Sequence, residues 1–397
     1  HYIIYFENCK KNRFQKKFDF CGAIKYNIIE RKLREAEDIK KIFNALRAPG
    51  ISTGYLYFYV HAVLEIVCYA ALARIVGDSY LLWTIPLLYD AVAFLPQAVI
   101  GRLKDAFARI PLGLIGLILL IFGFWTFSVD ALPGTYTEIF ILSLGNACLH
   151  VAGAEATLHS SYGKLSHSAI FVSGGSLGGI AGKLLGKTGI PFYFFVLLAL
   201  TTVPFIILAE KLRKKHEKSG SDCRSFNYHN PSFPVFATVI TAVIIVAVRS
   251  YMGYGIPTSW NKTAFQTVLL YAFMCFGKAF GGVLCDAYGI KKTALISIIG
   301  ALPFLLFGND LMIISLIGIM LFSMTMPVTL GVLVSALPDT PGLAFGLTTV
   351  GLFFGALPIF FIRFSGNLYS ILSISVLSIL CLVGAILILP ENKNKKQ

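Results

Sequence analysis

Several titratable side chains lie inside apolar segments of this sequence, and their types and spacing suit the binding and release of protons. His61 and Glu65 stand one helical turn apart in an apolar run, with Tyr57 one turn earlier on the same face. Asp90 stands at a similar depth in the next apolar run. A charge inside a bilayer costs on the order of 3 kcal/mol or more, so each group needs a reason to be there. Carboxyl and imidazole groups at that depth can carry protons.

Other polar residues inside apolar runs extend this pattern. Asn146 and His150 stand one helical turn apart, whereas the second half of the chain carries Arg249 and Lys278, which favour an anionic solute. We expect proton coupling at Glu65, Asp90, His61 and His150. We expect solute binding at Tyr57, Asn146, Arg249 and Lys278. The alternative for each residue is structural, either a polar network that joins helices or a long side chain that reaches the lipid headgroups.

The composition is that of a membrane protein. The chain is 56% hydrophobic and 14% charged, with a mean hydropathy of +0.74, which is too apolar for a soluble globule. The net charge of +14 is concentrated in the two ends and one central loop, a distribution that argues against nucleic-acid binding. The eight cysteines are scattered without metal-ligand spacing, and no phosphate-binding loop occurs. We therefore expect no metal site, no cofactor, no catalytic residue and no ATP-driven step.

Runs of about 20 apolar residues recur along the chain, each long enough to cross a hydrocarbon core of about 30 Å. We expect an N-terminal segment at 1–50 with an amphipathic helix from residue 28 to residue 46, a linker at 211–232 and a tail at 391–397. Two bundles of six spans each, at 51–210 and 233–390, make up the rest. The twelve expected spans are residues 52–75, 80–100, 110–128, 135–157, 168–188, 190–209, 233–254, 263–284, 293–308, 311–334, 342–362 and 367–389.

A short polar motif occurs once in each half. The sequence GRLKDAFAR of Gly101–Arg109 returns as GVLCDAYGIKK in Gly282–Lys292, with Gly, Leu, Asp and Ala at matching places. The repeat predicts two similar membrane halves. G-x-L-x-D followed by basic residues resembles the loop signature of the major facilitator superfamily, and this resemblance extends from residue 51 to residue 390. The glycine in the eighth place of that signature is kept as Gly289, but Ala108 replaces it in the first copy.

The resemblance implies an all-α polytopic protein, with twelve transmembrane helices in two pseudo-symmetric six-helix bundles that rock about a central site. It also implies a gate formed by Gly101, Asp105, Arg109, Gly282, Asp286 and Lys291. We expect Asp105 to face the helix that starts near Asp339–Gly342, whose N-terminus carries partial positive charge, and Glu155 to meet Arg102 or Arg109. Because the fifth and eighth helices of this superfamily meet, we expect Gly174, Gly178, Gly182 and Gly186 to face the eighth span and let that interface rock, with Gly277 and Gly281 as their counterparts.

Residues Leu144–Gly182 also resemble the fourth and fifth helices of efflux carriers of the fosmidomycin-resistance type. The resemblance is carried by His150, with Val151 in place of a proline, and by Phe171, Gly174, Gly175 and Gly178. The distribution of lysine and arginine predicts that both termini are cytoplasmic. We expect a monomer in the inner or plasma membrane.

The resulting functional hypothesis is proton-coupled efflux of a small organic solute, anionic in character, by alternating access. The alternatives within transport are a uniporter and a proton-coupled importer of a small metabolite. Outside transport, the alternatives are a transporter-like sensor and a membrane-embedded enzyme, for which His61 and Glu65 are the one pair close in sequence.

Overall fold

The computed structural model of the chain describes residues 35–76, 83–126, 135–218, 225–308, 310–361 and 367–390. The chain divides into two units, residues 1–47 and residues 48–397. In the first unit, residues 35–46 are helical. The first part of the expected amphipathic helix and the tail at 391–397 lie outside the described residues. The rest of this subsection concerns the second unit, in which no β-strand occurs among the described residues.

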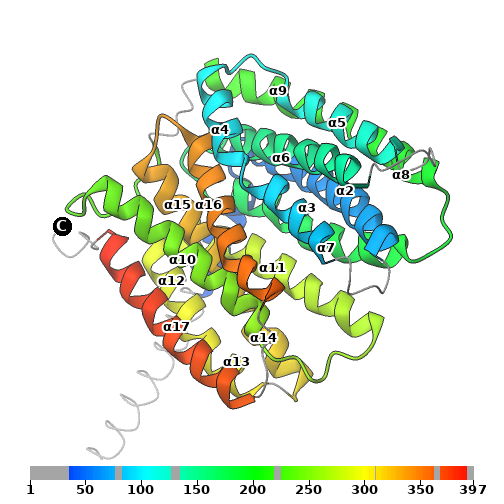
Figure 1. Ribbon diagram of the computed structural model, residues 1–397. Helices are drawn as coiled ribbons and strands as arrows, with labels where there is room; N and C mark the ends of the chain where they lie inside the picture. Colours follow the sequence, from blue (N-terminus) through cyan, green and yellow to red (C-terminus); the bar gives the residue numbers. More distant parts are fainter. Residues whose placement is uncertain are drawn as a thin grey trace, which may run out of the picture. The chain divides into compact units, whose positions relative to one another are not determined.

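Helices that correspond to the first six expected spans form the first half of this unit (Figure 1). They are α2 (Ile51–Val76), α3 (Thr84–Phe94), α4 (Gln97–Ala106), α5 (Leu112–Thr126), α6 (Thr135–His159), α7 (Ser166–Gly186), α8 (Phe192–Leu200) and α9 (Val203–Lys218). The second and sixth spans are each divided into two helices, α3 with α4 and α8 with α9. Helix α9 runs into the segment that the sequence predicted as the start of the linker.

The second half has the same succession of spans. Its elements are α10 (Val235–Gly255), α11 (Ala264–Tyr288), α12 (Ile290–Ile299), α13 (Ala301–Phe307), α14 (Met312–Ser323), α15 (Thr325–Ala336), α16 (Pro341–Ala356), the 3-10 turn η3 (Leu357–Phe360) and α17 (Asn367–Ile388). Among the described residues, 11 helical segments are long and apolar enough to cross a membrane. The shorter apolar helix Leu112–Trp125 lies at the third expected span, residues 110–128.

Four of the interrupted spans have a proline at the interruption or close after it. Pro96 precedes α4, and Pro204, Pro303 and Pro327 lie in the first turns of α9, α13 and α15. Proline cannot donate a backbone hydrogen bond to the preceding turn, and its ring crowds the carbonyl four residues earlier. The interruption is therefore encoded locally in each case.

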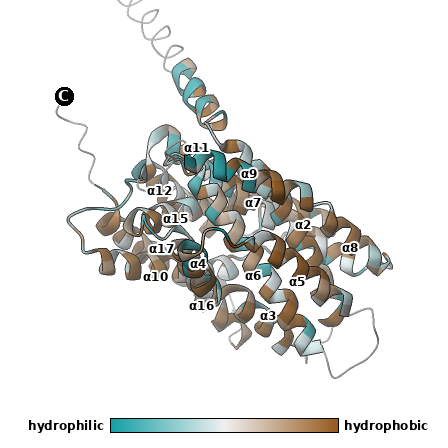
Figure 2. Ribbon diagram, turned by 90° about the horizontal axis from the view of Figure 1, so that it is seen from above, coloured by the Kyte–Doolittle hydropathy of each residue, from teal (hydrophilic) through white to brown (hydrophobic). Residues whose placement is uncertain are grey.

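Outward-facing helices carry apolar side chains that remain exposed. Trp125 of α5, Leu197 of α8, Phe236 of α10 and Leu380 of α17 are examples. Figure 2 shows α5, α8 and α10 as largely hydrophobic. Helices that are apolar on all sides, at a length sufficient to cross a bilayer, are typical of segments that face lipid.

Glycines bring α7 into backbone contact with α2. A Cβ atom added at Gly174, Gly178 or Gly182 would lie 2.3, 2.2 or 2.5 Å from a backbone carbonyl oxygen of α2. The expectation that these glycines face the eighth span is therefore wrong, because their close contacts lie within the first half. Helix α7 does pack against α11, the eighth span, through another face, and α4 packs against α16. These two helix pairs connect the halves.

Candidate functional site

A buried polar network lies between α2, α3 and α6. The amide nitrogen Nδ2 of Asn146 donates to Glu65 Oε1 at 3.1 Å and to the hydroxyl oxygen of Tyr89 at 2.8 Å. Its Oδ1 lies 2.6 Å from Nδ1 of His150. Asn146 is therefore the centre of the network, and its side chain is occupied by protein partners rather than open to a solute.

Two imidazoles complete this network. Nε2 of His61 lies 2.7 Å from Nε2 of His150, and the two nitrogens lie 3.7 and 3.5 Å from Glu65 Oε1. Nδ1 of His61 lies 3.0 Å from the carbonyl oxygen of Phe171 on α7. The structure thus brings together three of the four residues for which the sequence predicted proton coupling. Their three ligand atoms lie within 4.8 Å of one another, close enough to share a metal ion.

The fourth residue, Asp90, lies apart from these three. It is half-buried on α3, and the described residues offer it neither a hydrogen bond nor a salt bridge. The charged groups that act on it across a longer distance are Glu65 and Lys183. Lys183 in turn lies over the ring of Tyr69, 5.1 Å from its centroid. Asp90 is therefore a carboxyl group in the bundle without a direct partner among the described side chains.

Of two tyrosines near the network, Tyr89 is bonded to it and Tyr57 is not. Tyr57, predicted to bind solute, is buried and packs edge-on against Phe171 with ring centroids 6.0 Å apart. Tyr89, which the sequence reasoning missed, bonds directly to Asn146. Its place next to Asp90 in an apolar run was the available signal, but nothing in the spacing connects it with Asn146.

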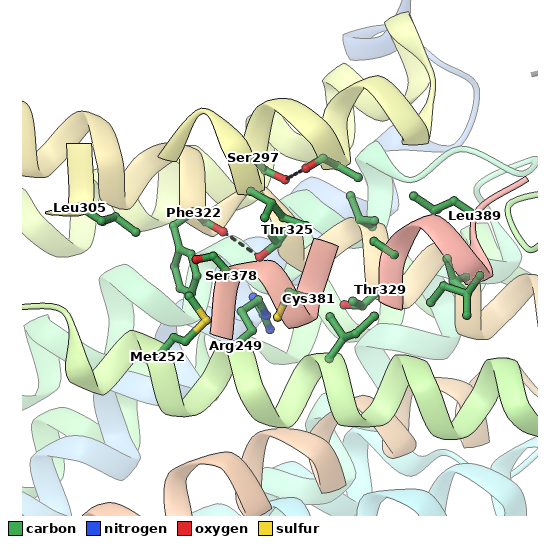
Figure 3. A pocket seen from close by; sticks show the side chains of 17 residues that line it. Arg249, Met252, Ser297, Leu305, Phe322, Thr325, Thr329, Ser378, Cys381 and Leu389 are labelled. Atoms are coloured by element: carbon green, nitrogen blue, oxygen red, sulfur yellow. Dashed lines mark hydrogen bonds between the residues drawn. The ribbon is translucent and has the colours of Figure 1, made fainter. Parts of the chain in front are cut away.

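The two cations of the second half occupy different surroundings. Nζ of Lys278 on α11 donates to Ser176 Oγ of α7 at 2.8 Å, so this lysine lies where the halves meet. Arg249 on α10 instead points into a cavity within the second half, where Figure 3 shows it beside Cys381 of α17. Its Nε is buried without a hydrogen-bond partner. Among the described residues, neither cation has a carboxylate within salt-bridge distance.

The repeated motif places its two aspartates on helix N-termini. Asp105, at the end of α4, accepts hydrogen bonds from the backbone amides of Gly342 and Leu343 at the start of α16, each at 2.9 Å. Asp286, at the end of α11, accepts from the amides of Leu165 and Ser166 at the start of α7, at 2.8 and 3.0 Å. We call these contacts the crossed caps, because each joins one half to the other. We call the end of the molecule that holds them the motif end.

The motif glycines allow the close approach that the crossed caps require. A Cβ atom at Gly101 would lie 2.1 Å from the carbonyl oxygen of Gly342, and one at Gly282 would lie 2.3 Å from Ala169 Cβ. Any larger residue would push α4 away from α16, or α11 away from α7.

The basic residues of the motif do not join the caps. Arg109 is exposed, and Lys291 is half-buried. The described residues give neither of them a hydrogen bond or a salt bridge. The geometry at the motif end therefore rests on the glycines and aspartates of the motif, and the gating assigned to Arg109 and Lys291 stays a prediction.

A cluster of ionisable side chains that the sequence reasoning missed lies within the first half, between α6 and α9. Glu155 of α6 is paired with Arg213 of α9 at 3.1 Å and with His159 at 3.4 Å. Arg213 is itself buried and also bonds to Glu210. The expectation that Glu155 meets Arg102 or Arg109 is wrong, because α9 continues far enough to bring Arg213 to it. Arg213 stands in a run of basic residues, KLRKK, which gives no sign of burial.

The segment before α10 is fastened to both halves. The hydroxyl of Tyr228 donates to the carbonyl oxygen of Gly163 at 3.0 Å, and its backbone amide donates to Ser335 Oγ at 2.8 Å. Burial raises the pKa of the Tyr228 phenol above its usual range, and the nearby Asp286 adds to this effect. The phenol therefore stays protonated and able to donate at neutral pH.

Comparison with known proteins identifies the fold. No protein-family model and no curated protein matches the chain in sequence. Among solved structures, the human organic anion transporter MFSD10 (TETRAN) matches with a TM-score of 0.61 and 14% identity, covering 86% of this chain and 99% of that one. The Escherichia coli fucose:proton symporter FucP matches with a TM-score of 0.58 and 14% identity, over 84% of this chain and 98% of that one.

The proton:xylose symporter XylE, a major facilitator superfamily protein, matches with a TM-score of 0.55 and 12% identity, over 88% of this chain and 95% of that one. The structural similarity establishes the fold, whereas sequence identities this low leave the substrate open. They do not bear on the local resemblance to carriers of the fosmidomycin-resistance type, which stays a prediction. The chain is an integral membrane protein with the fold of the major facilitator superfamily.

Proposed function

We propose that the protein is a secondary transporter that exports a small organic anion by alternating access, with protons as the coupling ion. The crossed caps carry this proposal. Asp105 and Asp286 each bond to the first turn of a helix in the opposite half. These contacts can break without unfolding either half, so the motif end can open and close as the halves rock.

Proton coupling is best supported at Asp90. The other three candidates, His61, Glu65 and His150, are engaged with one another. A carboxyl group without a partner in a low-dielectric bundle is favoured as a neutral group, because a bare charge is poorly solvated there. Uptake of a proton would therefore change the charge at this point of α3 without breaking a protein contact.

An anionic solute is supported by the cations of the second half. Lys278 lies where α11 meets α7, and its described partner is the hydroxyl of Ser176. Arg249 acts on Lys278 electrostatically, so the two positive charges are near enough to attract the same anion. MFSD10, which has the same fold, is an organic anion transporter. We assign the first contact with the solute to Lys278, because it lies between the halves.

The placement in the membrane follows from charge. Basic residues gather in the loops at the motif end, in the last turns of α9 and at both chain ends. By the positive-inside rule the motif end and both termini are cytoplasmic. We propose a monomer in the inner or plasma membrane, with the crossed caps closing the cytoplasmic side.

A second candidate function is proton-coupled import. FucP and XylE, which share the fold, are both proton symporters. In that case Asp90 would bring its proton in with the solute rather than exchange it. The direction of the coupled proton flux separates the two candidates.

The experiment uses purified protein in liposomes that contain a pH-sensitive dye. Gradients of organic anions, sugars and amphiphilic drugs are imposed one at a time on wild-type protein, on Asp90→Asn and on the matched carboxyl-to-amide control Glu138→Gln. In the wild type and in the control, we expect movement of an organic anion to drive protons across the membrane in the opposite direction, which the dye reports as a pH change. Asp90→Asn should give no such pH change. Lys278→Gln should raise the KM for the anion, whereas the exposed Lys262→Gln should not.

The results also define what contradicts the proposal. A pH change that Asp90→Asn leaves intact removes Asp90 from the coupling step. Co-directional movement of solute and protons supports import, and solute movement without any pH change supports a uniporter. Binding of a solute that never crosses the membrane would support the sensor.

A further inference from the structure

The side chains of His61, Glu65 and His150 direct three electron-pair donors at one point. The two Nε2 atoms lie 2.7 Å apart, and Glu65 Oε1 lies 3.7 and 3.5 Å from them. All three side chains are buried. They come from α2 and α6, and their separation in sequence explains why residue spacing predicted no metal site.

Hydrogen bonds on the far side of each ring fix the place of its proton. Nδ1 of His61 faces the carbonyl oxygen of Phe171, and Nδ1 of His150 faces Oδ1 of Asn146. Asn146 uses its Nδ2 to donate to Glu65 and Tyr89, so its Oδ1 is the acceptor. Both Nδ1 atoms therefore carry a proton, and a neutral ring in that tautomer has its lone pair on Nε2.

Where both rings are in this neutral tautomer, two lone pairs face each other beside a carboxylate oxygen, and a cation between them relieves the repulsion. We propose that His61, Glu65 and His150 bind one divalent transition-metal ion of the zinc, cobalt and nickel class through their Nε2, Oε1 and Nε2 atoms. Imidazole and carboxylate ligands suit these ions, whereas calcium and magnesium prefer oxygen alone. Metal-binding histidines usually donate their second ring N–H to a carbonyl or carboxylate oxygen, and both imidazoles here face such an acceptor.

Gly175 keeps the space beside the site free. A Cβ atom at this position would lie 2.4 Å from Nε2 of His61. Ligand nitrogens about 2.0–2.1 Å from a tetrahedral ion are roughly 3.3 Å apart, so the imidazoles must separate by about 0.6 Å when the ion enters. The missing side chain gives the His61 ring room to move. Three protein ligands leave a fourth position for water or for an atom of another ligand.

The test is metal binding by the purified full-length chain in detergent, after treatment with a chelator. Co²⁺ is titrated and followed by its visible absorption, which reports a site of four or five ligands. We expect one Co²⁺ per chain, displaced by Zn²⁺, and a loss of affinity in His61→Ala, His150→Ala and Glu65→Gln at least as large as the roughly 10–100-fold that loss of an outer-shell partner costs. His216→Ala, which removes an imidazole elsewhere, should bind as the wild type does.

Gly175→Ala provides a variant that keeps all three ligands. It should weaken Co²⁺ binding, because its methyl group takes the space that the His61 ring needs. X-ray absorption of the wild type with one equivalent of Zn²⁺ should give a nitrogen and oxygen shell that includes two imidazoles. This measurement does not depend on how well a variant folds.

Two outcomes overturn the proposal. One is affinity for Co²⁺ that is equal in wild type and in the three ligand variants, which would place the ion elsewhere. The other is no stoichiometric binding, which would leave a shared proton as the cation between the imidazoles. Because binding is measured without transport and Asp90 is not a ligand, a negative result here leaves the proposed transport function standing.

Discussion

Asp105 and Asp286 mirror each other across the molecule, each accepting two backbone hydrogen bonds at the first turn of a helix that belongs to the opposite half. A carboxylate at a helix N-terminus interacts favourably with the partial positive charge there, in addition to the hydrogen bonds themselves. Removal of the charge should therefore weaken closure of the motif end more than removal of a neutral contact would.

Asp105→Asn tests this point with little change of size. Hydrogen bonds to charged groups contribute about 1.5–3 kcal/mol, so we expect amide hydrogen exchange at Gly342 and Leu343 to accelerate by roughly tenfold or more. Mass spectrometry of the peptide at the start of α16 measures this rate. Asp310→Asn, which changes an exposed carboxylate bonded to Ser259, is the control. Unchanged exchange at the start of α16 would contradict the role of the cap.

Glycine substitutions test the helix contacts beneath the caps. Gly101→Ala and Gly282→Ala each place a methyl group within 2.1 to 2.3 Å of an atom in the opposite half. Overpacking of this kind costs about 1–3 kcal/mol, so we expect lower thermal stability and slower transport. Gly189→Ala is the matched control, since no atom lies within 4 Å of its added Cβ. Equal behaviour of the three variants would show that the close approach is unimportant.

Loss of Arg213 should be costly because its partner is buried. Arg213→Gln removes the guanidinium from Glu155, whose other contact among the described salt-bridge partners is the imidazole of His159. Breaking a buried ion pair from one side costs about 3–5 kcal/mol, and we expect a corresponding fall in thermal stability. The double variant Glu155→Gln with Arg213→Gln should recover part of the loss. A double variant less stable than either single one would contradict the pairing.

Tyr228 gives a prediction about alkaline pH. Its folded-state pKa lies above the usual value near 10, so its contribution to stability is complete below about pH 10 and is lost as pH rises toward the folded pKa. Tyr228→Phe also removes the bond to Gly163, worth about 1 kcal/mol. Wild type and variant should therefore differ most at neutral pH and converge above pH 10 in chemical unfolding. A difference in unfolding free energy between wild type and variant that grows above pH 10 would contradict a raised folded-state pKa of Tyr228.

The spans were predictable because bilayer thickness fixes their length, and because the apolar runs end in polar or glycine-containing turns. The cap at Asp105 was also predicted, because the resemblance to the superfamily assigns the motif aspartates to neighbouring helix ends, and the helix that starts near Gly342 offered such an end.

Sequence spacing could not reveal contacts made between helices. His61 and Glu65 are one turn apart on the same helix, so their proximity could be predicted. His150 comes close to them only because of how α6 packs against α2, which spacing does not show. The same holds for Tyr89, whose partner lies on α6. Gly174 and Gly178 had the spacing of a helix contact, yet nothing in the spacing says that the partner is α2 rather than α11.

The crossed caps act in parallel on one movement. In the transport cycle proposed above, rocking of the halves would break both caps, so their free energies would add in the barrier and the mean dwell time of the closed state would depend on the product of two factors. Weakening either cap shortens that dwell time without abolishing closure. In that proposal, the duplicated motif would make the timing of the cycle adjustable in small steps, through single substitutions at either of two distant places in the chain.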